Sequence, residues 1–337
     1  MRAPHPGAMI DRSRFTCGIG DGRVVYTCSA CTSFFRRSLR FKKPLKSCSK
    51  HCYQYATNEA VEIICKFCRF HQCIRIGMIN NQKYGSLSKL LQNLSIMDES
   101  RENVVLNMAV PLTTSADTIL THTFIKFEKK AANQPMVSFD WGLLHQLSSI
   151  EFMKKFQFVK FLTTQDLMVF LKSAHFKHTV FVNSMRAYNA KQDFMSFPDG
   201  TDVFPEVIGE VNCYNLEFLN KVRKKLIGRI IELKINSDEF LLLTAIISCH
   251  AGSNDLSDNG RAVISAYQKI YVSYLFQYCS KTNEQSGPSR FSELLSICHL
   301  VSQAHDDIRQ FFVLFQLYQP ESQPKQLHRK FIEYLGM

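Results

Sequence analysis

The chain has 337 residues, a length that suits two domains, and its positive charge is concentrated near the N-terminus. Residues 1–90 contain 16 Lys and Arg against 4 Asp and Glu, whereas residues 91–337 contain 25 of each, so the formal net charge of +12 belongs to the first part. A basic domain joined to a neutral one indicates nucleic acid or another anionic surface as partner. No apolar run reaches the roughly 18 residues of a bilayer span, and the N-terminus lacks the apolar stretch of a secretory signal. We therefore expect an intracellular protein without a membrane partner.

Cysteines define the first domain. Eight of the 12 cysteines lie between Cys17 and Cys73, after residues 1–16, which have no periodicity and are expected to be mobile. The pairs Cys28/Cys31 and Cys65/Cys68 have the C-x2-C spacing with which two thiolates from one tight turn bind zinc. In an intracellular protein, clustered cysteines indicate metal ligands rather than disulfides. Residues 17–78 are therefore expected to form a small zinc-stabilised, α-rich domain.

The two expected zinc modules differ in completeness. The pair Cys65/Cys68 is completed by Cys48 and Cys52, and less favoured substitutes are His51, His71 and Cys73. The pair Cys28/Cys31 has only one upstream cysteine, and the candidates for its fourth ligand, which lack the usual spacing, are His5 and Asp11. We expect Zn²⁺ in one complete site and consider a second site with an unfinished ligand set. The expected metal ligands are Cys17, Cys28, Cys31, Cys48, Cys52, Cys65 and Cys68.

A basic, aromatic segment follows the first cysteine pair. The pattern predicts a helix over residues 29–41, in which Phe34 and Phe35 form an apolar face that packs on the second zinc module. A helix held at its start by zinc, with basic residues further along, suits insertion into the major groove of DNA. The alternative is a solvated basic face or a nuclear import signal. The expected DNA-contacting residues are Ser29, Ala30, Thr32 and Ser33 at the helix start and Arg36, Arg37, Arg40, Lys42 and Lys43 beyond it.

The rest of the chain is expected to be helical after a polar linker over residues 79–120, which contains one short helix at 86–94. From about residue 121 apolar residues recur every three to four positions, which predicts an all-helical domain over 121–337. Thr163 or Thr164 is the expected N-cap of one helix. No run of alternating strands is found. The expected helices are 141–162, 164–188, 215–233, 237–249, 257–279, 289–318 and 326–335, with a turn within 194–205.

These motifs resemble those of the nuclear hormone receptor family, particularly its divergent members in nematodes. TCSACTSFFRRS at 27–38 is similar to the zinc ligands that lead into the family's recognition helix, and CKFCRFHQCIRIGM at 65–78 to its closing cysteine pair. EFMKKFQFVKFLTTQDLMVFLK at 151–172 resembles the signature of the ligand-binding domain, and FIEYL at 331–335 resembles the activation helix. The resemblance implies two zinc modules of the four-cysteine type that bind double-stranded DNA, followed by an all-α, helical-sandwich ligand-binding domain.

The resemblance also implies partners for the helical domain. Lys154 and Lys172 stand where the family has coactivator-binding lysines, and Glu333 stands at the acid of the activation helix 326–335. Charges at the two ends of an apolar groove grip the two poles of an amphipathic helix. Coactivators or corepressors, a second receptor chain (identical or different), a small lipophilic ligand and a nuclear location follow as expectations.

Three departures from the family pattern bear on DNA binding. Asp11 and Arg14 stand where the first module has cysteines, so either this site has three cysteines or a different N-terminal exon is missing from this sequence. Three residues separate Cys48 from Cys52, where the family commonly has five. The helix start lacks the usual Glu and Lys, so the usual DNA half-site is not expected.

Three classes of function are compared. The leading hypothesis is a ligand-regulated, DNA-binding transcription factor. The alternative is a receptor-like cofactor that dimerises with other receptors and regulates transcription without binding DNA strongly itself, because the first zinc module is incomplete. An enzyme is not expected, since the histidines of the helical domain lack a nucleophile and carboxylate constellation. These histidines are His175, His178, His250, His299 and His305.

Overall fold

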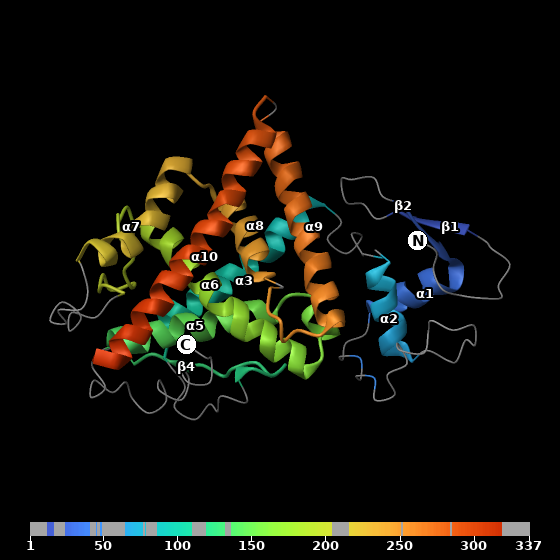
Figure 1. The fold of residues 1–337 in the computed structure, drawn as a ribbon, viewed down its shortest axis with the longest axis horizontal. Helices are drawn as coiled ribbons and strands as arrows, with labels where there is room; N and C mark the ends of the chain where they lie inside the picture. Colours follow the sequence, from blue (N-terminus) through green and yellow to red (C-terminus); the bar gives the residue numbers. More distant parts are fainter. Residues whose placement is uncertain are drawn as a thin grey trace.

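The computed structural model describes residues 12–16, 24–40, 45, 48, 65–76, 78, 86–109, 119–131, 136–203, 216–250, 252–283 and 285–318. These residues form a small N-terminal module and a larger helical domain beside it (Figure 1). A small module followed by an all-helical domain is the order that the sequence predicts.

The N-terminal module consists of a two-stranded hairpin and two helices. β1 (Arg12–Thr16) pairs antiparallel with β2 (Val24–Cys28), and α1 (Ser29–Ser38) follows directly. α2 (Lys66–Arg75) begins immediately after Cys65. The sequence does not predict this hairpin, and β1 lies at the end of residues 1–16, the segment expected to be mobile. Backbone pairing with β2 holds β1 in place. The sequence of β1, RSRFT, has one large apolar side chain and lacks the alternating apolar pattern that predicts a strand.

The helical domain has three layers. α3 (Leu87–Asn107) and α5 (Ser138–Lys154) form one layer, α6 (Thr164–Asn189), α8 (Ser237–Ser248) and α9 (Asp258–Thr282) the middle, and α7 (Leu216–Leu233) and α10 (Gly287–Tyr318) the other face. A short antiparallel pair, β3 (Met108–Ala109) with β4 (Glu128–Lys129), follows α3. α9 and α10 meet at one end and diverge toward the other (Figure 1). Among the described residues, no helix has the length and apolarity needed to cross a membrane.

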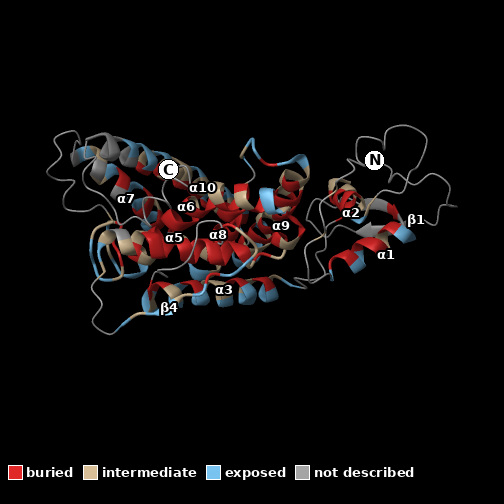
Figure 2. Cartoon of the chain, turned by 90° about the horizontal axis from the view of Figure 1, so that it is seen from below, coloured by how far each residue is buried: buried red, intermediate tan, exposed pale blue. Residues whose placement is uncertain are grey.

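The structure corrects two expected elements. The expected linker contains α3, which has 21 residues rather than one short helix. Its buried stripe is narrow and consists of Leu90, Leu94, Arg101 and Val105. The remaining faces are polar, so the composition of this segment resembles that of a linker. Figure 2 shows this helix with one buried and one exposed face. The single helix expected over 141–162 is instead α5 followed by a separate 3-10 turn, η2 (Val159–Phe161). The chain turns between these two elements, and Phe156 and Phe158 in the turn remain buried.

The starts of α6, α8 and α9 agree with the sequence because they carry polar caps. Thr163 accepts a hydrogen bond from the Asp166 amide (3.0 Å) at the start of α6, and Asn236 accepts one from the Glu239 amide (2.9 Å) at the start of α8. Ser257 caps α9 through the Gly260 amide (3.0 Å). The expected helix 326–335 lies outside the described residues.

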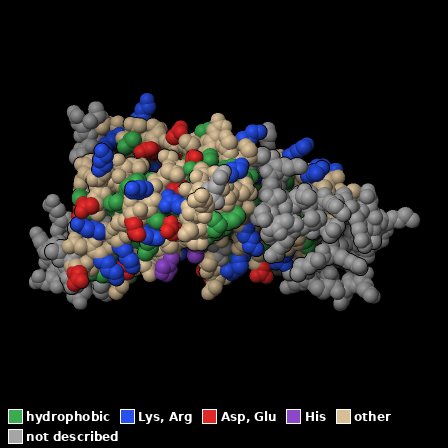
Figure 3. Space-filling view, turned by 90° about the horizontal axis from the view of Figure 1, so that it is seen from above, with side chains coloured by type: hydrophobic (Ala, Val, Ile, Leu, Met, Phe, Trp, Pro, Cys, Tyr) green, Lys and Arg blue, Asp and Glu red, His purple; other side chains and the backbone are tan. Residues whose placement is uncertain are grey.

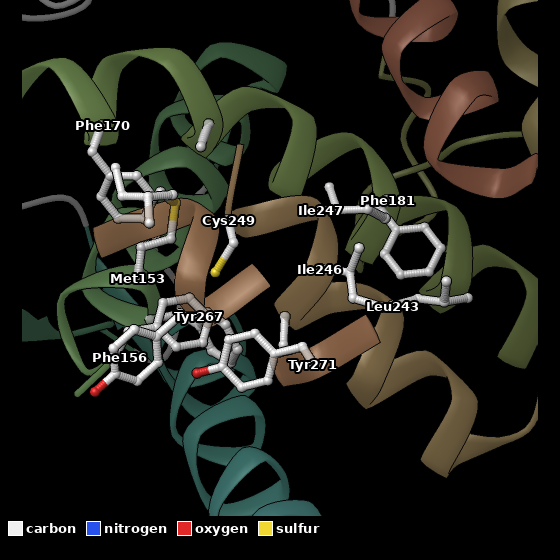
Figure 4. Close-up of a cluster of buried hydrophobic side chains, with 14 of the residues drawn as sticks. Met153, Phe156, Phe170, Phe181, Leu243, Ile246, Ile247, Cys249, Tyr267 and Tyr271 are labelled. Atoms are coloured by element: carbon white, nitrogen blue, oxygen red, sulfur yellow. The ribbon is translucent and has the colours of Figure 1, made fainter. Parts of the chain in front are cut away.

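Aromatic side chains fill the centre of the helical domain. Figure 4 shows Phe156 beside Tyr267 and Tyr271, with Met153, Phe170 and Cys249 close by. Phe158, which is fully buried, stacks on Phe156 with ring centroids 5.4 Å apart. Such offset contacts add to the burial of apolar area, so this cluster stabilises the layer order.

Candidate zinc centre and nucleic-acid interface

Three cysteine sulfurs of the N-terminal module converge on one point. The Sγ atoms of Cys48, Cys65 and Cys68 lie within 4.8 Å of one another. In a tetrahedral zinc site with Zn–S bonds of about 2.3 Å, neighbouring sulfurs are about 3.8 Å apart, so this spacing suits a shared metal. Cys65 is the N-cap of α2 and its sulfur accepts a hydrogen bond from the Cys68 amide (3.5 Å). The expected fourth ligand, Cys52, lies outside the described residues.

The proximity of the three sulfurs suits a bound cation. Burial raises the pKa of the Cys68 thiol well above its ordinary value, and hydrogen bonds and charges of the Cys48 and Cys65 sulfurs raise it further. Three adjacent thiolates repel one another, whereas a bound Zn²⁺ reverses this effect and deprotonates coordinating thiols. The donor set therefore suits zinc better than it suits three free thiols.

The first cysteine pair is described only in part. Cys31 is buried, and the Arg69 Nη2 atom lies 4.0 Å from its sulfur. The side chains of Cys17 and Cys28 lie outside the described residues. Arg14 pairs with Tyr26 in the hairpin, and a guanidinium cannot ligate zinc. His71, a considered substitute, is buried in α2 at the contact with the helical domain, and Cys73 is buried there too.

The basic helix α1 is held by aromatic packing on α2. Phe35 is fully buried and stacks on Phe70, with ring centroids 5.5 Å apart. The guanidinium of Arg69 lies 4.4 Å from the centre of the Phe34 ring, and its Nη2 donates to the Ala30 carbonyl (3.3 Å). The expectation that the two phenylalanines pack on the second zinc module is confirmed.

Most expected DNA-contacting residues that the structure describes are exposed. Five of the seven side chains are polar or basic and exposed: Ser29, Ser33, Arg36, Arg37 and Arg40. Ala30 is also exposed, and Thr32 is half-buried, where its hydroxyl lies 2.7 Å from that of Thr27. Lys42 and Lys43 lie outside the described residues. In contrast, basic and acidic side chains are interspersed over the helical domain on the face in Figure 3.

The structure places the expected coactivator lysines in unlike environments. Lys154 is only 5% exposed, and its Nζ donates to the Thr123 carbonyl (2.6 Å) and the Glu151 carboxylate (2.8 Å). Burial lowers the pKa of Lys154, and Glu151 opposes this shift. In this arrangement the charge of Lys154 faces Glu151 and Thr123 rather than the surface, and its role in coactivator binding stays a prediction. Glu333 lies outside the described residues.

Lys172 lines a cleft of about 350 Å³ that the sequence did not reveal. The cleft lies between α6, the loop before α9 and the second half of α10, and contains three imidazoles and several cations: His175, Lys177, His250, His305 and Arg309. The Nζ atom of Lys177 lies 3.3 Å from Nε2 of His250. No sequence signal joins these residues, because they come from three segments that only the fold brings together.

Comparison with known proteins agrees with both halves of the structure. Residues 19–80 match the double treble clef zinc finger, C4 type, and residues 126–318 match the ligand-binding domain of nuclear hormone receptor. The chain therefore belongs to the nuclear hormone receptor family, whose members are transcription factors with a zinc-binding, DNA-binding domain and a ligand-binding domain.

Relatives match along nearly the whole chain. Nuclear hormone receptor family member nhr-27 of Caenorhabditis elegans is 40% identical over 313 residues, which cover 92% of this chain and 88% of that protein. Family members nhr-9 and nhr-167 of the same organism are 34% and 33% identical, and cover 90% and 92% of this chain and the same shares of their own lengths. The family consists of transcription factors rather than enzymes.

Proposed function

We propose that the protein binds double-stranded DNA with α1 in the major groove and regulates transcription through its helical domain. The observation that carries this proposal is the exposed basic side of α1, whose opposite side is fixed by Phe34 and Phe35. A rigid helix that exposes Arg36 and Arg37, followed by a turn that exposes Arg40, neutralises phosphates at little cost in conformational entropy. The atypical residues at the helix start select a half-site of their own.

A salt series tests DNA binding. Duplexes selected from a random pool are titrated with the full chain at several salt concentrations, and binding is measured by fluorescence anisotropy. Replacing Arg36 and Arg37 by Gln should weaken binding and reduce the slope of log K against log salt by about 0.9 for each lost phosphate contact. Lys281→Gln removes one exposed charge from the helical domain and serves as control. Absence of binding to any duplex at low salt contradicts the proposal.

A second candidate is a receptor-like cofactor that dimerises with other receptors without binding DNA strongly. It is favoured by Arg14, which occupies a ligand position of the first module and pairs with Tyr26 in the hairpin. Zinc stoichiometry from native mass spectrometry separates the two candidates. Two metals per chain support DNA binding by two modules, and one metal or none supports the cofactor.

We propose that the protein recruits a coactivator through Lys172 and Glu333, and that Lys154 takes no part in this contact. Lys172 is half-buried at the cleft and Lys154 is engaged by Glu151 and Thr123. Glu333→Lys and Lys172→Glu should each lower activation of a reporter gene and leave DNA affinity unchanged. The double exchange should restore part of the activity, because it reverses both charges together. Equal loss of DNA binding in the single variants argues against separate roles.

Three further proposals follow from the family. The protein acts in the nucleus, pairs with a second receptor chain and responds to a small lipophilic ligand. Imaging of the tagged full chain tests its location, and sedimentation with and without candidate receptors tests pairing. Native mass spectrometry of protein purified from cells tests for a co-purifying lipid, and a mass equal to the zinc-loaded chain alone contradicts a tightly bound ligand.

A further inference from the structure

The zinc module and the helical domain share one apolar core. The ring of Phe70 is fully buried and lies between Phe35 of α1, with centroids 5.5 Å apart, and Phe161 of η2, with centroids 4.4 Å apart. Ile74 and Met78 are buried in the same continuous cluster, which extends into α5, α6 and α9. A large, dry interface restricts the relative motion that is otherwise the default between domains.

Polar contacts fix the same interface. Nζ of Lys160 donates a hydrogen bond of 2.7 Å to the carbonyl of Leu39, the residue after α1 ends. A cation at the carbonyl end of a helix satisfies a backbone acceptor and interacts favourably with the helix dipole. The helical domain thus supplies the C-terminal cap of the basic helix. Arg75 and Asp258 approach to 3.9 Å at the edge, where exposure of Asp258 makes the ion pair weak.

The interface connects the zinc site to a corner of the helical domain. Phe70 lies two residues after Cys68 on α2, and Phe161 precedes the N-cap of α6. Asp166, in the first turn of α6, accepts hydrogen bonds from the amide and hydroxyl of Ser257, the N-cap of α9 (both 2.9 Å). A continuous set of contacts therefore runs from the cysteines to the starts of α6 and α9.

We propose that Phe70–Phe161 and Lys160–Leu39 couple the zinc site and the basic helix to the corner of the helical domain that η2 and the starts of α6 and α9 form. Zinc bound by the cysteines stabilises this corner. By thermodynamic linkage, a ligand that binds to this corner more tightly when zinc is present also raises the affinity of the cysteines for zinc by the same factor. This inference concerns coupling within the chain and does not depend on which DNA or coactivator is bound.

Hydrogen exchange of the full chain tests the coupling. Amide exchange is followed by mass spectrometry with zinc bound and after chelation. In the wild type, chelation should increase exchange in peptides covering 158–167 and 258–263 by about fivefold or more, the lower end of typical coupling between sites. The start of α10, which lies away from the interface, is the internal reference (Figure 1). A smaller increase at the corner, or an equal increase at the start of α10, overturns the proposal.

Variants at the interface separate coupling from general destabilisation. Lys160→Met keeps the apolar stem and removes the hydrogen bond to Leu39, and Phe161→Leu keeps an apolar side chain and removes the ring contact. Each should reduce the response of the corner to chelation and weaken zinc binding in a chelator competition. Lys155→Met is the matched control, since Lys155 lies in the same segment but bonds to Ser100 within the helical domain (2.7 Å). A wild-type response in both interface variants, or the same loss in the control, overturns the proposal.

Discussion

Asp166 joins the starts of α6 and α9 through one buried carboxylate. It is 2% exposed and accepts hydrogen bonds from the hydroxyl of Thr163 (2.8 Å) and from the amide and hydroxyl of Ser257. Gly260 lies against it: a Cβ atom there would be 2.6 Å from the carboxylate. The glycine in the first turn of α9 therefore makes room for the carboxylate, and larger residues would displace it.

Replacing Asp166 by Ala should lower the free energy of unfolding by about 1–3 kcal/mol, because three hydrogen bonds to a buried carboxylate, from Thr163 and Ser257, are lost. Urea unfolding of the zinc-loaded chain measures this. Asp193→Ala is the matched control, since Asp193 makes a surface ion pair with Lys224 and should change stability by less than about 1 kcal/mol. Equal effects of the two substitutions would contradict the assigned role of Asp166.

Buried histidines make stability depend on pH. Burial lowers the pKa of His145 to about 3, of His175 to about 4, and of His178 well below its ordinary value. The charges of Arg101 and His175 lower the pKa of His178 further. Because the unfolded chain binds protons near pH 6.5 and the folded chain does not, the stability from these residues is complete above that pH and decreases as the pH falls.

Each such histidine should contribute a loss of about 1.4 kcal/mol per pH unit below pH 6.5. His178→Leu removes one titrating group and should make the dependence of unfolding free energy on pH shallower by that amount. Urea unfolding at several pH values between 7.5 and 5 measures both slopes. Loss of zinc at low pH affects both proteins equally. Parallel profiles of wild type and variant would show that His178 is protonated in the folded state.

At the scale of elements, one ion pair joins α8 to α10. The guanidinium of Arg290 donates to both carboxylate oxygens of Glu239 (2.8 and 2.6 Å) and to the carbonyl of Leu233 (2.8 Å). Glu239 is only 2% exposed and also caps α8 through the Asn236 amide (3.1 Å). The pair positions the start of α10 against the end of α7.

Removing Arg290 from this pair should cost about 3–5 kcal/mol, since Glu239 stays buried without its partner. We expect Arg290→Met to show this loss in urea unfolding, and Glu239→Gln to show a smaller one because Arg290 is half-buried. The double variant should lose less than the sum of the two single losses, because it leaves no buried charge. Strictly additive losses would mean that the two side chains act independently.

Polar caps explain which elements the sequence predicts. Thr163, Asn236 and Ser257 stand directly before apolar helices, so the starts of α6, α8 and α9 could be predicted. Between α5 and η2 the buried Phe156 and Phe158 continue the apolar pattern of the helix before them, so periodicity cannot reveal a turn there. The burial of Lys154 could not be predicted either, because its partner Thr123 belongs to a segment without any helix or strand pattern.

At the scale of the whole molecule, the cysteine spacing predicted the zinc ligands that the structure brings together, Cys48, Cys65 and Cys68. The positions of Phe34 and Phe35 also predicted which side of α1 packs inward. The contact between domains has no such signal. Lys160 and Leu39 are 121 positions apart, and a single lysine in an apolar segment is ordinarily a solvated residue. Long-range contacts of this kind depend on tertiary packing.

The ring of Phe70 also determines how the chain can be divided for experiments. A fragment of residues 1–85 would uncover Phe70 and Met78, which are fully buried in the intact chain. Exposed apolar patches of this kind promote self-association, so the fragment should form oligomers in sedimentation velocity runs at concentrations where the full chain does not. Phe70→Ser in the fragment should restore a monomer. Recombinant protein for crystallisation or DNA selection should therefore retain both domains.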